Sequence, residues 1–366
     1  MVEIKKSILM RSFNRLTLTY LLFAILSSCS NSSVFISKVQ KVGEPDEVVE
    51  LEVEKIKSDY LYTRYFAVYD TLLIVSCPNR PEDNFYVSNL KTGELLGSFM
   101  HRGHGPGEFL GVTPVTRLEF TDGNLTALTY EPFNHQVLDW NITQSLIIQG
   151  DSIKRLGYYK DPNDAVNYWK IFRINPTQYV GYTHEDVLDF SDDFLLPTYW
   201  ILEGKEISPV KGISIVNKDA CTKDNIGFLS SEWNIKPDNS KIVDVMKHFE
   251  QINIIDLKND KVSSYRVKGS PGENSLESDL STVDYQYLDV ACNDSAIYAL
   301  YAGDTKENIT KNHGAFMIHK FNWNGDFEAK YKISEPVYRL WLDPSNNTLY
   351  GYNEPEDVLI RIGQNL

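Results

Sequence analysis

The chain has 366 residues and a formal net charge of −14 at pH 7, from 36 basic and 50 acidic residues. This excess of acid argues against sequence-independent binding to nucleic acid, which depends on a cationic surface. Aromatic residues are frequent, with 22 Tyr, 17 Phe and 6 Trp. Strands accommodate such side chains well, and the chain shows no helical periodicity, so we expect a large all-β domain.

The first residues look like an export signal. Basic residues precede a short apolar run, 16–26, which is too short to cross a bilayer. The run ends in Leu26-Ser-Ser-Cys29, which resembles a bacterial lipobox. We therefore expect residues 1–28 to be a lipoprotein signal peptide and Cys29 to carry the lipid, with an ordinary signal peptide as the alternative. By analogy with lipoprotein sorting, Ser30 favours the outer membrane, with the domain facing the periplasm or the outside.

Residues 29–46 are polar and contain Gly43 and Pro45, so we expect a tether between the lipid and the folded domain. Three further cysteines cannot all pair, and their spacing fits no zinc motif. We interpret them as small core or strand residues: Cys77, Cys221 and Cys292.

One strand pattern recurs six times in the rest of the chain. Each copy is a turn residue followed by a short, mostly apolar strand. The strands start at Leu72, Leu125, Gln178, Ile242, Ala296 and Thr348. Successive starts are 53, 53, 64, 54 and 52 residues apart, and other strands recur in fixed order around each start. Four antiparallel strands in each such unit are typical of a β-propeller blade, so we predict a six-bladed propeller over residues 47–366.

The sixth copy lacks room for its fourth strand, because the sequence stops at Leu366 soon after the third. The segment from Val48 to Val53 alternates between apolar and polar residues as a strand does. We predict that this N-terminal segment supplies the missing strand and closes the ring, which removes two exposed sheet edges.

A glycine-rich loop, Gly103-His-Gly-Pro-Gly-Glu-Phe109, follows the first copy, and Pro271-Gly-Glu273 follows the fourth. A phosphate-binding loop needs a helix behind it, and none is expected here, so we interpret the loop as a structural turn. Together with the six copies and the lipobox, it resembles the six-bladed, TolB-like and NHL-like propeller lipoproteins of Bacteroidetes. The resemblance spans the whole mature chain. It implies the fold and leaves the activity open, because related propellers include lyases, lactonases and pure binding modules.

Cations recur on the first strand of several blades. They lie eight or nine residues before the starts of the six recurring strands named above. The six positions hold Arg64, Arg117, Lys170, Asn234, Tyr287 and Arg339. First strands line a propeller channel, so we predict that the four cations bind an anion such as a carboxylate, sulfate or phosphate. The alternative is that each cation pairs with a neighbouring carboxylate, such as Glu119 or Asp343.

Histidines and carboxylates gather on the face that carries the blade-to-blade loops, which we call the top face. The glycine-rich loop contributes His101, Arg102 and His104. Six residues after four of the strand starts lie Glu131, His184, His248 and Glu354. Such side chains can bind a divalent transition metal, and the resemblance adds that some NHL-type lyases use a central metal. A solvated polar rim is the alternative.

Two functions remain open from the sequence. The first is a non-catalytic binding or scaffold module at the cell envelope, anchored by lipid and presenting its top face to an envelope protein or a glycan. The second is a metal-dependent lyase or hydrolase on the histidine-rich face. Apart from such a metal we expect no cofactor, and no Gly-x-Ser-x-Gly motif occurs. We interpret Trp169, Trp233 and Trp341 as core between blades, with sugar stacking as the alternative.

Overall fold

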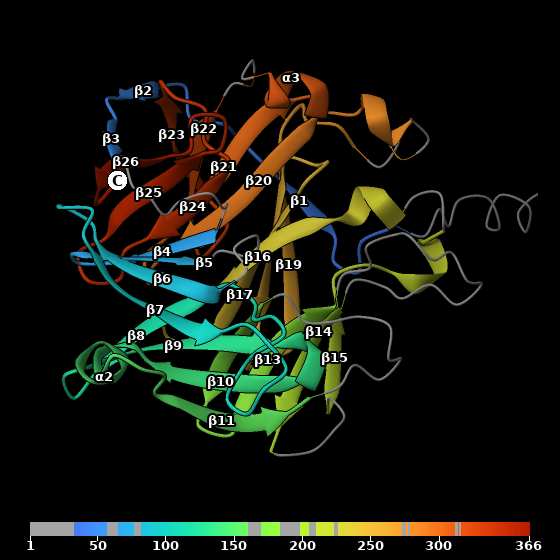
Figure 1. The fold of residues 1–366 in the computed structure, drawn as a ribbon. Coiled ribbons are helices and arrows are strands. Elements are labelled where there is room, and N and C mark those ends of the chain that lie inside the picture. The colour runs from blue at the N-terminus through green and yellow to red at the C-terminus, as the bar shows by residue number, and fades with distance from the viewer. Residues whose placement is uncertain are drawn as a thin grey trace, which may run out of the picture.

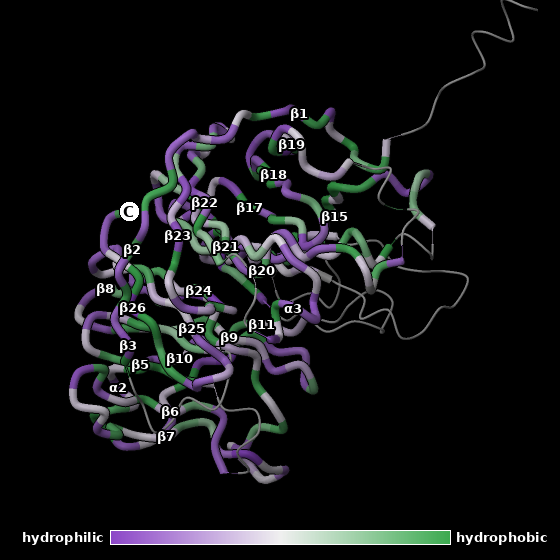
Figure 2. The backbone as a smooth tube through the Cα atoms, turned by 90° about the horizontal axis from the view of Figure 1, so that it is seen from above, coloured by the Kyte–Doolittle hydropathy of each residue, from purple (hydrophilic) through white to green (hydrophobic). Residues whose placement is uncertain are grey.

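Six small antiparallel sheets surround a central axis in the computed structural model (Figures 1 and 2). The structure describes residues 33–56, 65–76, 82–159, 170–183, 198–204, 210–222, 226–272, 276, 279–311, 314 and 316–366. The predicted six-bladed propeller is confirmed. No helix within these ranges is long and apolar enough to span a membrane.

Each blade is built from consecutive strands, with the first strand on the channel. Blade 1 holds β4 (Tyr65–Tyr69), β5 (Leu72–Ser76), β6 (Asp83–Asn89) and β7 (Leu95–His101). Blade 2 holds β8 (Arg117–Thr121), β9 (Asn124–Glu131), β10 (Gln136–Asn141) and β11 (Ile153–Tyr158), with helix α2 (Ile142–Ile148) before its last strand. Blade 3 holds β12 (Ile171–Asn175), β13 (Gln178–Thr183), β14 (Thr198–Glu203) and β15 (Lys211–Ser214).

The second half of the ring repeats this order. Blade 4 holds β16 (Ser231–Ile235), β17 (Lys241–Met246), β18 (Gln251–Asp256) and β19 (Lys261–Val267). Blade 5 holds β20 (Tyr285–Cys292), β21 (Ala296–Asp304), β22 (Met317–Asn322) and β23 (Phe327–Ile333), with α3 (Lys306–Thr310) after its second strand. Blade 6 holds β24 (Arg339–Leu342), β25 (Thr348–Asn353) and β26 (Val358–Gln364).

The core lies between neighbouring blades, where apolar faces of the sheets meet. Between blades 1 and 2, the rings of Phe85 and Trp140 lie 5.1 Å apart, centroid to centroid. Tight turns set the spacing within a blade: Asp122 and Gly123, both with positive φ, join β8 to β9. Two positive φ values at a two-residue turn match the twist of a hairpin. The six predicted strand starts therefore mark real second strands.

Three short N-terminal strands close the ring. Strand β1 (Val39–Val42) pairs in parallel with β19, and β2 (Val48–Leu51) pairs in parallel with β23. Strand β3 (Glu54–Ile56) pairs antiparallel with β26 and supplies the fourth strand of blade 6.

Closure by an N-terminal strand was predicted correctly, but the predicted segment was wrong. Val48–Leu51 adds a fifth strand to blade 5, and the next three-residue strand completes blade 6. An alternating pattern fits the edge of either blade, and the choice depends on partners such as Glu356 and Glu335, which both lie 2.9 Å from Lys55.

The part of the expected tether that the structure describes, 33–46, lies against the propeller. Val34 and Phe35 are 6% and 3% exposed and pack between blades 3 and 4. The polar composition of the segment concealed this apolar pair. Residue 29, the expected lipid site, lies outside the described residues.

Candidate functional site

The channel contains two adjoining pockets that share Phe172, Asn234 and Trp341 in their walls. The upper pocket, toward the starts of the first strands and hence the top face, holds about 640 Å³ of open space, counting the part open to solvent. Its walls combine aromatic and charged side chains: Tyr65, Phe66, Thr116, Lys170, Phe172, Asn234, Asp289, Arg339 and Trp341 among them. The lower pocket lies toward the strand ends and includes Arg117 and Cys292.

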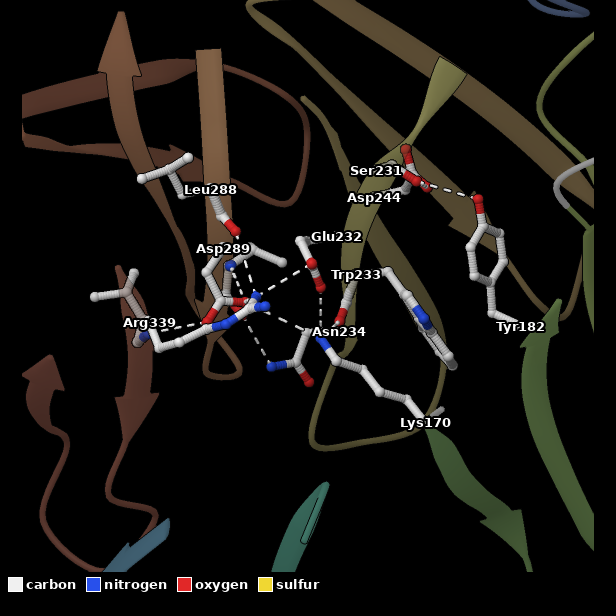
Figure 3. A network of polar contacts seen from close by, with 12 residues as sticks. Lys170, Tyr182, Ser231, Glu232, Trp233, Asn234, Asp244, Leu288, Asp289 and Arg339 are labelled. Atoms are coloured by element: carbon white, nitrogen blue, oxygen red, sulfur yellow. Dashed lines mark hydrogen bonds and ion pairs between the residues drawn. The ribbon is translucent and has the colours of Figure 1, made fainter. Parts of the chain in front are cut away.

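A largely buried carboxylate, Glu232 on β16 with 14% of its side chain exposed, lies among three cations at the upper pocket, and two of them, Lys170 and Arg339, appear in Figure 3. Its oxygens lie 3.1 Å from Lys170 Nζ, 3.1 Å from Arg339 Nη1 and 3.3 Å from Lys247 Nζ. Burial favours the neutral acid, yet Arg339, Lys170 and Lys247 hold the pKa of Glu232 well below its usual value. The carboxylate therefore stays ionised and joins blades 3, 4 and 6.

Asp289 on β20 is the second carboxylate of the cluster. Its Oδ1 lies 4.0 Å from Lys170 Nζ and 3.9 Å from Arg339 Nη1, and its Oδ2 accepts a hydrogen bond from the backbone N–H of Leu340 at 2.9 Å. The Arg339 guanidinium also lies over the Tyr65 ring, 5.6 Å from its centroid. Three cations thus share two carboxylates, and the cluster carries one excess positive charge.

The predicted cation ring is brought together only in part. Lys170 and Arg339 meet at the upper pocket, but Arg117 lines the lower one. Its Nη2 donates to the carbonyl of Pro237 at 2.6 Å, and its Nε lies 3.3 Å from Glu119 Oε1. The three described cations of the predicted ring, Arg117, Lys170 and Arg339, all have carboxylate partners. The alternative interpretation expected such pairing, including the Arg117–Glu119 pair. Position 64 lies outside the described residues.

The ring splits because the counted residues do not occupy one register position in the first hairpins: Arg117 pairs with the fourth residue of its second-strand copy. Arg339 pairs with the fifth residue of its second-strand copy, and Asp289 takes that position in blade 5. The counted positions in blades 4 and 5 hold Asn234 and Tyr287. These pair instead with the second and sixth residues of their second-strand copies. Counting back from the strand starts therefore missed both carboxylates. Aligning the first strands by hairpin length is the signal that would have found Asp289.

The glycine-rich loop folds around its own glutamate. Glu108 Oε2 accepts a hydrogen bond from the backbone N–H of Gly105 at 2.7 Å. A Cβ on Gly103 would lie 1.9 Å from the same oxygen, so the glycine leaves room for the carboxylate. Phe109 is buried between blades, which secures the end of the loop. The interpretation as a structural turn agrees with these contacts.

The three polar residues of this loop lie on the top face. The Nδ1 atom of His101 lies 3.2 Å from Asp83 Oδ1, and the side chain is 59% exposed. His104 is exposed, and the backbone N–H of Arg102 donates to the carbonyl of Glu82 at 2.8 Å. None of these contacts joins the loop to the upper pocket.

The predicted metal ligands come from blades 2, 3, 4 and 6. Glu131 is fully buried, pairs with Arg155 at 3.1 Å and accepts from Asn134 at 2.7 Å. His248 is 2% exposed, and burial lowers its pKa to about 4. Position 184 lies outside the described residues, within which no three His, Cys, Asp or Glu side chains are placed to hold a metal. The metal site stays a prediction.

Two of the first-strand tryptophans have different surroundings. Trp233 is 3% exposed and packs against Phe172 and Tyr199 between blades 3 and 4. Trp341 lines both pockets, and its Nε1 donates to the carbonyl of Val68 at 2.9 Å, which fixes the ring. Trp341 is therefore the described tryptophan placed to meet a ligand in the channel.

Comparison with known proteins shows the fold and little more. No family model matches the chain, and no curated protein matches it. Among solved structures it is similar to a member of the DUF4221 family from Bacteroides vulgatus, with a TM-score of 0.57, 10% identity and coverage of 87% of this chain and 97% of that one. It is also similar to a candidate exported protein from Bacteroides fragilis, with a TM-score of 0.50, 11% identity and coverage of 89% and 99%. The chain is thus a propeller like these two Bacteroides proteins, and the finer resemblance to TolB-like and NHL-like propellers stays a prediction.

Proposed function

We propose that this protein is an exported lipoprotein of the cell envelope that binds an acidic saccharide at the upper pocket. One observation carries the proposal: cations with an excess positive charge lie beside aromatic walls in one concave site. Trp341 offers a fixed ring on which a sugar can stack, and Arg339 and Lys170 offer donors to a carboxylate or sulfate. The anion would balance the excess charge.

The binding test compares an oligogalacturonate with a neutral oligosaccharide of the same length by calorimetry. We expect the acidic chain to bind and the neutral one to bind far more weakly. Arg339→Ala removes a charged hydrogen bond worth about 1.5–3 kcal/mol, and so lowers affinity about tenfold or more. Arg117→Ala is the matched control, because Arg117 lines the lower pocket and is not part of the lining of the upper one. Equal losses in both variants, or equal binding of both oligosaccharides, would refute the proposed ligand.

The anchor is tested separately. Cys29→Ala removes the residue that would carry the lipid, so the variant should leave the membrane fraction for the soluble one. Fractionation identical to that of the unaltered protein would refute lipid anchoring and leave the ligand proposal standing.

A further inference from the structure

We infer that the propeller is held with one particular edge against the bilayer, the outer rim of blades 3 and 4. This inference rests on the proposed lipid at Cys29 and adds an orientation to it. The rim consists of β1, the edge strand of blade 4, and β15, the edge strand of blade 3, with the chain that immediately adjoins them.

The described chain is fastened to this rim at its very start. Asn217 donates its backbone N–H to the carbonyl of Val34 at 2.8 Å, and Ile36 donates to the carbonyl of Ile215 at 3.0 Å. The Phe35 ring lies 5.7 Å from that of Phe249, and the Arg266 guanidinium lies 5.4 Å from the Phe35 centroid. These contacts fix the point at which the chain reaches the propeller.

The chain between the lipid and this point is short. Five peptide links join Cys29 to Val34. An extended chain spans at most about 3.3–3.6 Å per residue, so the links reach no more than about 17 Å. A small domain is about 30 Å across. A linker of this length is too short for the opposite rim, at blades 6 and 1, to face the lipid surface.

The chemistry of the rim suits a lipid headgroup layer. Ile36 and Val210 are 59% and 54% exposed there. Lys38, Lys211 and Lys218 are also exposed on this rim, where Lys211 pairs with Asp260 and Asp219 adjoins Lys218, although the whole chain carries a net charge of −14. Apolar side chains and lysines together favour an interface with anionic lipid. The occupant of this rim is therefore the bilayer itself.

Lysine footprinting tests the orientation without changing the rim. The lipidated protein is reconstituted into vesicles of phosphatidylethanolamine and phosphatidylglycerol, treated with an acetylating reagent and read by mass spectrometry. Soluble Cys29→Ala protein is the reference. We expect acetylation of Lys38, Lys211 and Lys218 to fall severalfold on the vesicle, and that of Lys55 and Lys91, on blades 6 and 1, to stay unchanged.

A second variant separates the effect of linker length from the effect of lipidation. A flexible Gly-Ser insertion of about 20 residues between Cys29 and Ser33 keeps the lipid but should abolish the protection of the three rim lysines. Uniform protection, or protection at Lys55 and Lys91 in place of the rim, overturns the orientation and leaves the anchor intact. Cys29→Ala protein that stays on the membrane overturns the anchor, and with it this inference.

Discussion

At the scale of single residues, Glu232 is the side chain on which the channel depends most. It is an ionised carboxylate with little exposure, and three cations from three chain segments contact it. A buried ion pair adds little net stability over a well-packed apolar pair, but removing one partner is costly because it leaves the remaining charges buried without a counter-charge. The loss of Glu232 would leave Lys170, Lys247 and Arg339 facing each other with Asp289 alone to balance them.

Glu232→Gln should therefore lower the free energy of unfolding by about 3–5 kcal/mol at pH 7, as measured by urea denaturation. The matched control is Glu356→Gln, which weakens a pair with Lys55 whose members are 49% and 36% exposed. An exposed pair contributes at most about 1 kcal/mol. Equal costs for the two substitutions would contradict the central place of Glu232.

The same variant has a defined pH dependence. The folded pKa of Glu232 is depressed, so its contribution is complete above the ordinary pKa of about 4.5 and is lost as the pH falls through the folded pKa. The stability gap between the unaltered protein and Glu232→Gln should stay constant from pH 7 to 5 and narrow in more acidic solution.

The sequence predicted two of the residues at this site and missed the two that complete it. Lys170 and Arg339 stood out as cations at repeated positions. Asp289 did not, because the first hairpin of blade 5 is longer than the two-residue turns of blades 1 and 2. Glu232 did not, because it pairs with the fourth residue of its second-strand copy, whereas Arg339 pairs with the fifth. Ion pairing across a channel also depends on which side chains reach the same point in space, and a periodic count along one chain does not contain that information.

At the scale of elements, the glycine-rich loop between blades 1 and 2 is a turn built for a glutamate. The carboxylate of Glu108 fills the space left by Gly103 and accepts the N–H of Gly105. Sequence reasoning recognised the turn because no helix follows it. The role of Glu108 was not visible, since it requires the loop to fold back on itself.

Gly103→Ala should cost about 1–3 kcal/mol, because the new methyl group displaces the carboxylate and leaves the Gly105 N–H without it. In a Glu108→Ala background the same change should cost less than about 0.5 kcal/mol, since the clash is gone. A double-mutant cycle measured by thermal unfolding reports this coupling. Gly43→Ala, where a Cβ meets nothing within 4 Å, is the control. Additive costs would contradict the proposed contact.

At the scale of the whole molecule, the N-terminal segment fastens blades 4, 5 and 6 from outside. Phe35 is its deepest anchor, so Phe35→Ala should lower the free energy of unfolding by about 3–5 kcal/mol. The neighbouring Ile36 is exposed, and Ile36→Ala should change it by less than about 0.5 kcal/mol. Denaturant unfolding of both variants measures these free energies. Equal free energies of unfolding for the two variants would mean that the segment adds nothing to stability.

The pairing of these strands also constrains the order of folding. Contacts of the N-terminal segment join residues 227, 282 and 301 positions apart, at Ser37 with Ser264, Glu50 with Lys332 and Lys55 with Glu356. Closing loops of that length is entropically costly, and folds dominated by such contacts form slowly. The N-terminal strands are synthesised first, but they can pair only after the last blades have been synthesised. Until then they are an unpaired, strand-forming stretch, so a chain cut short before blade 4 would have no partner for any of the three strands.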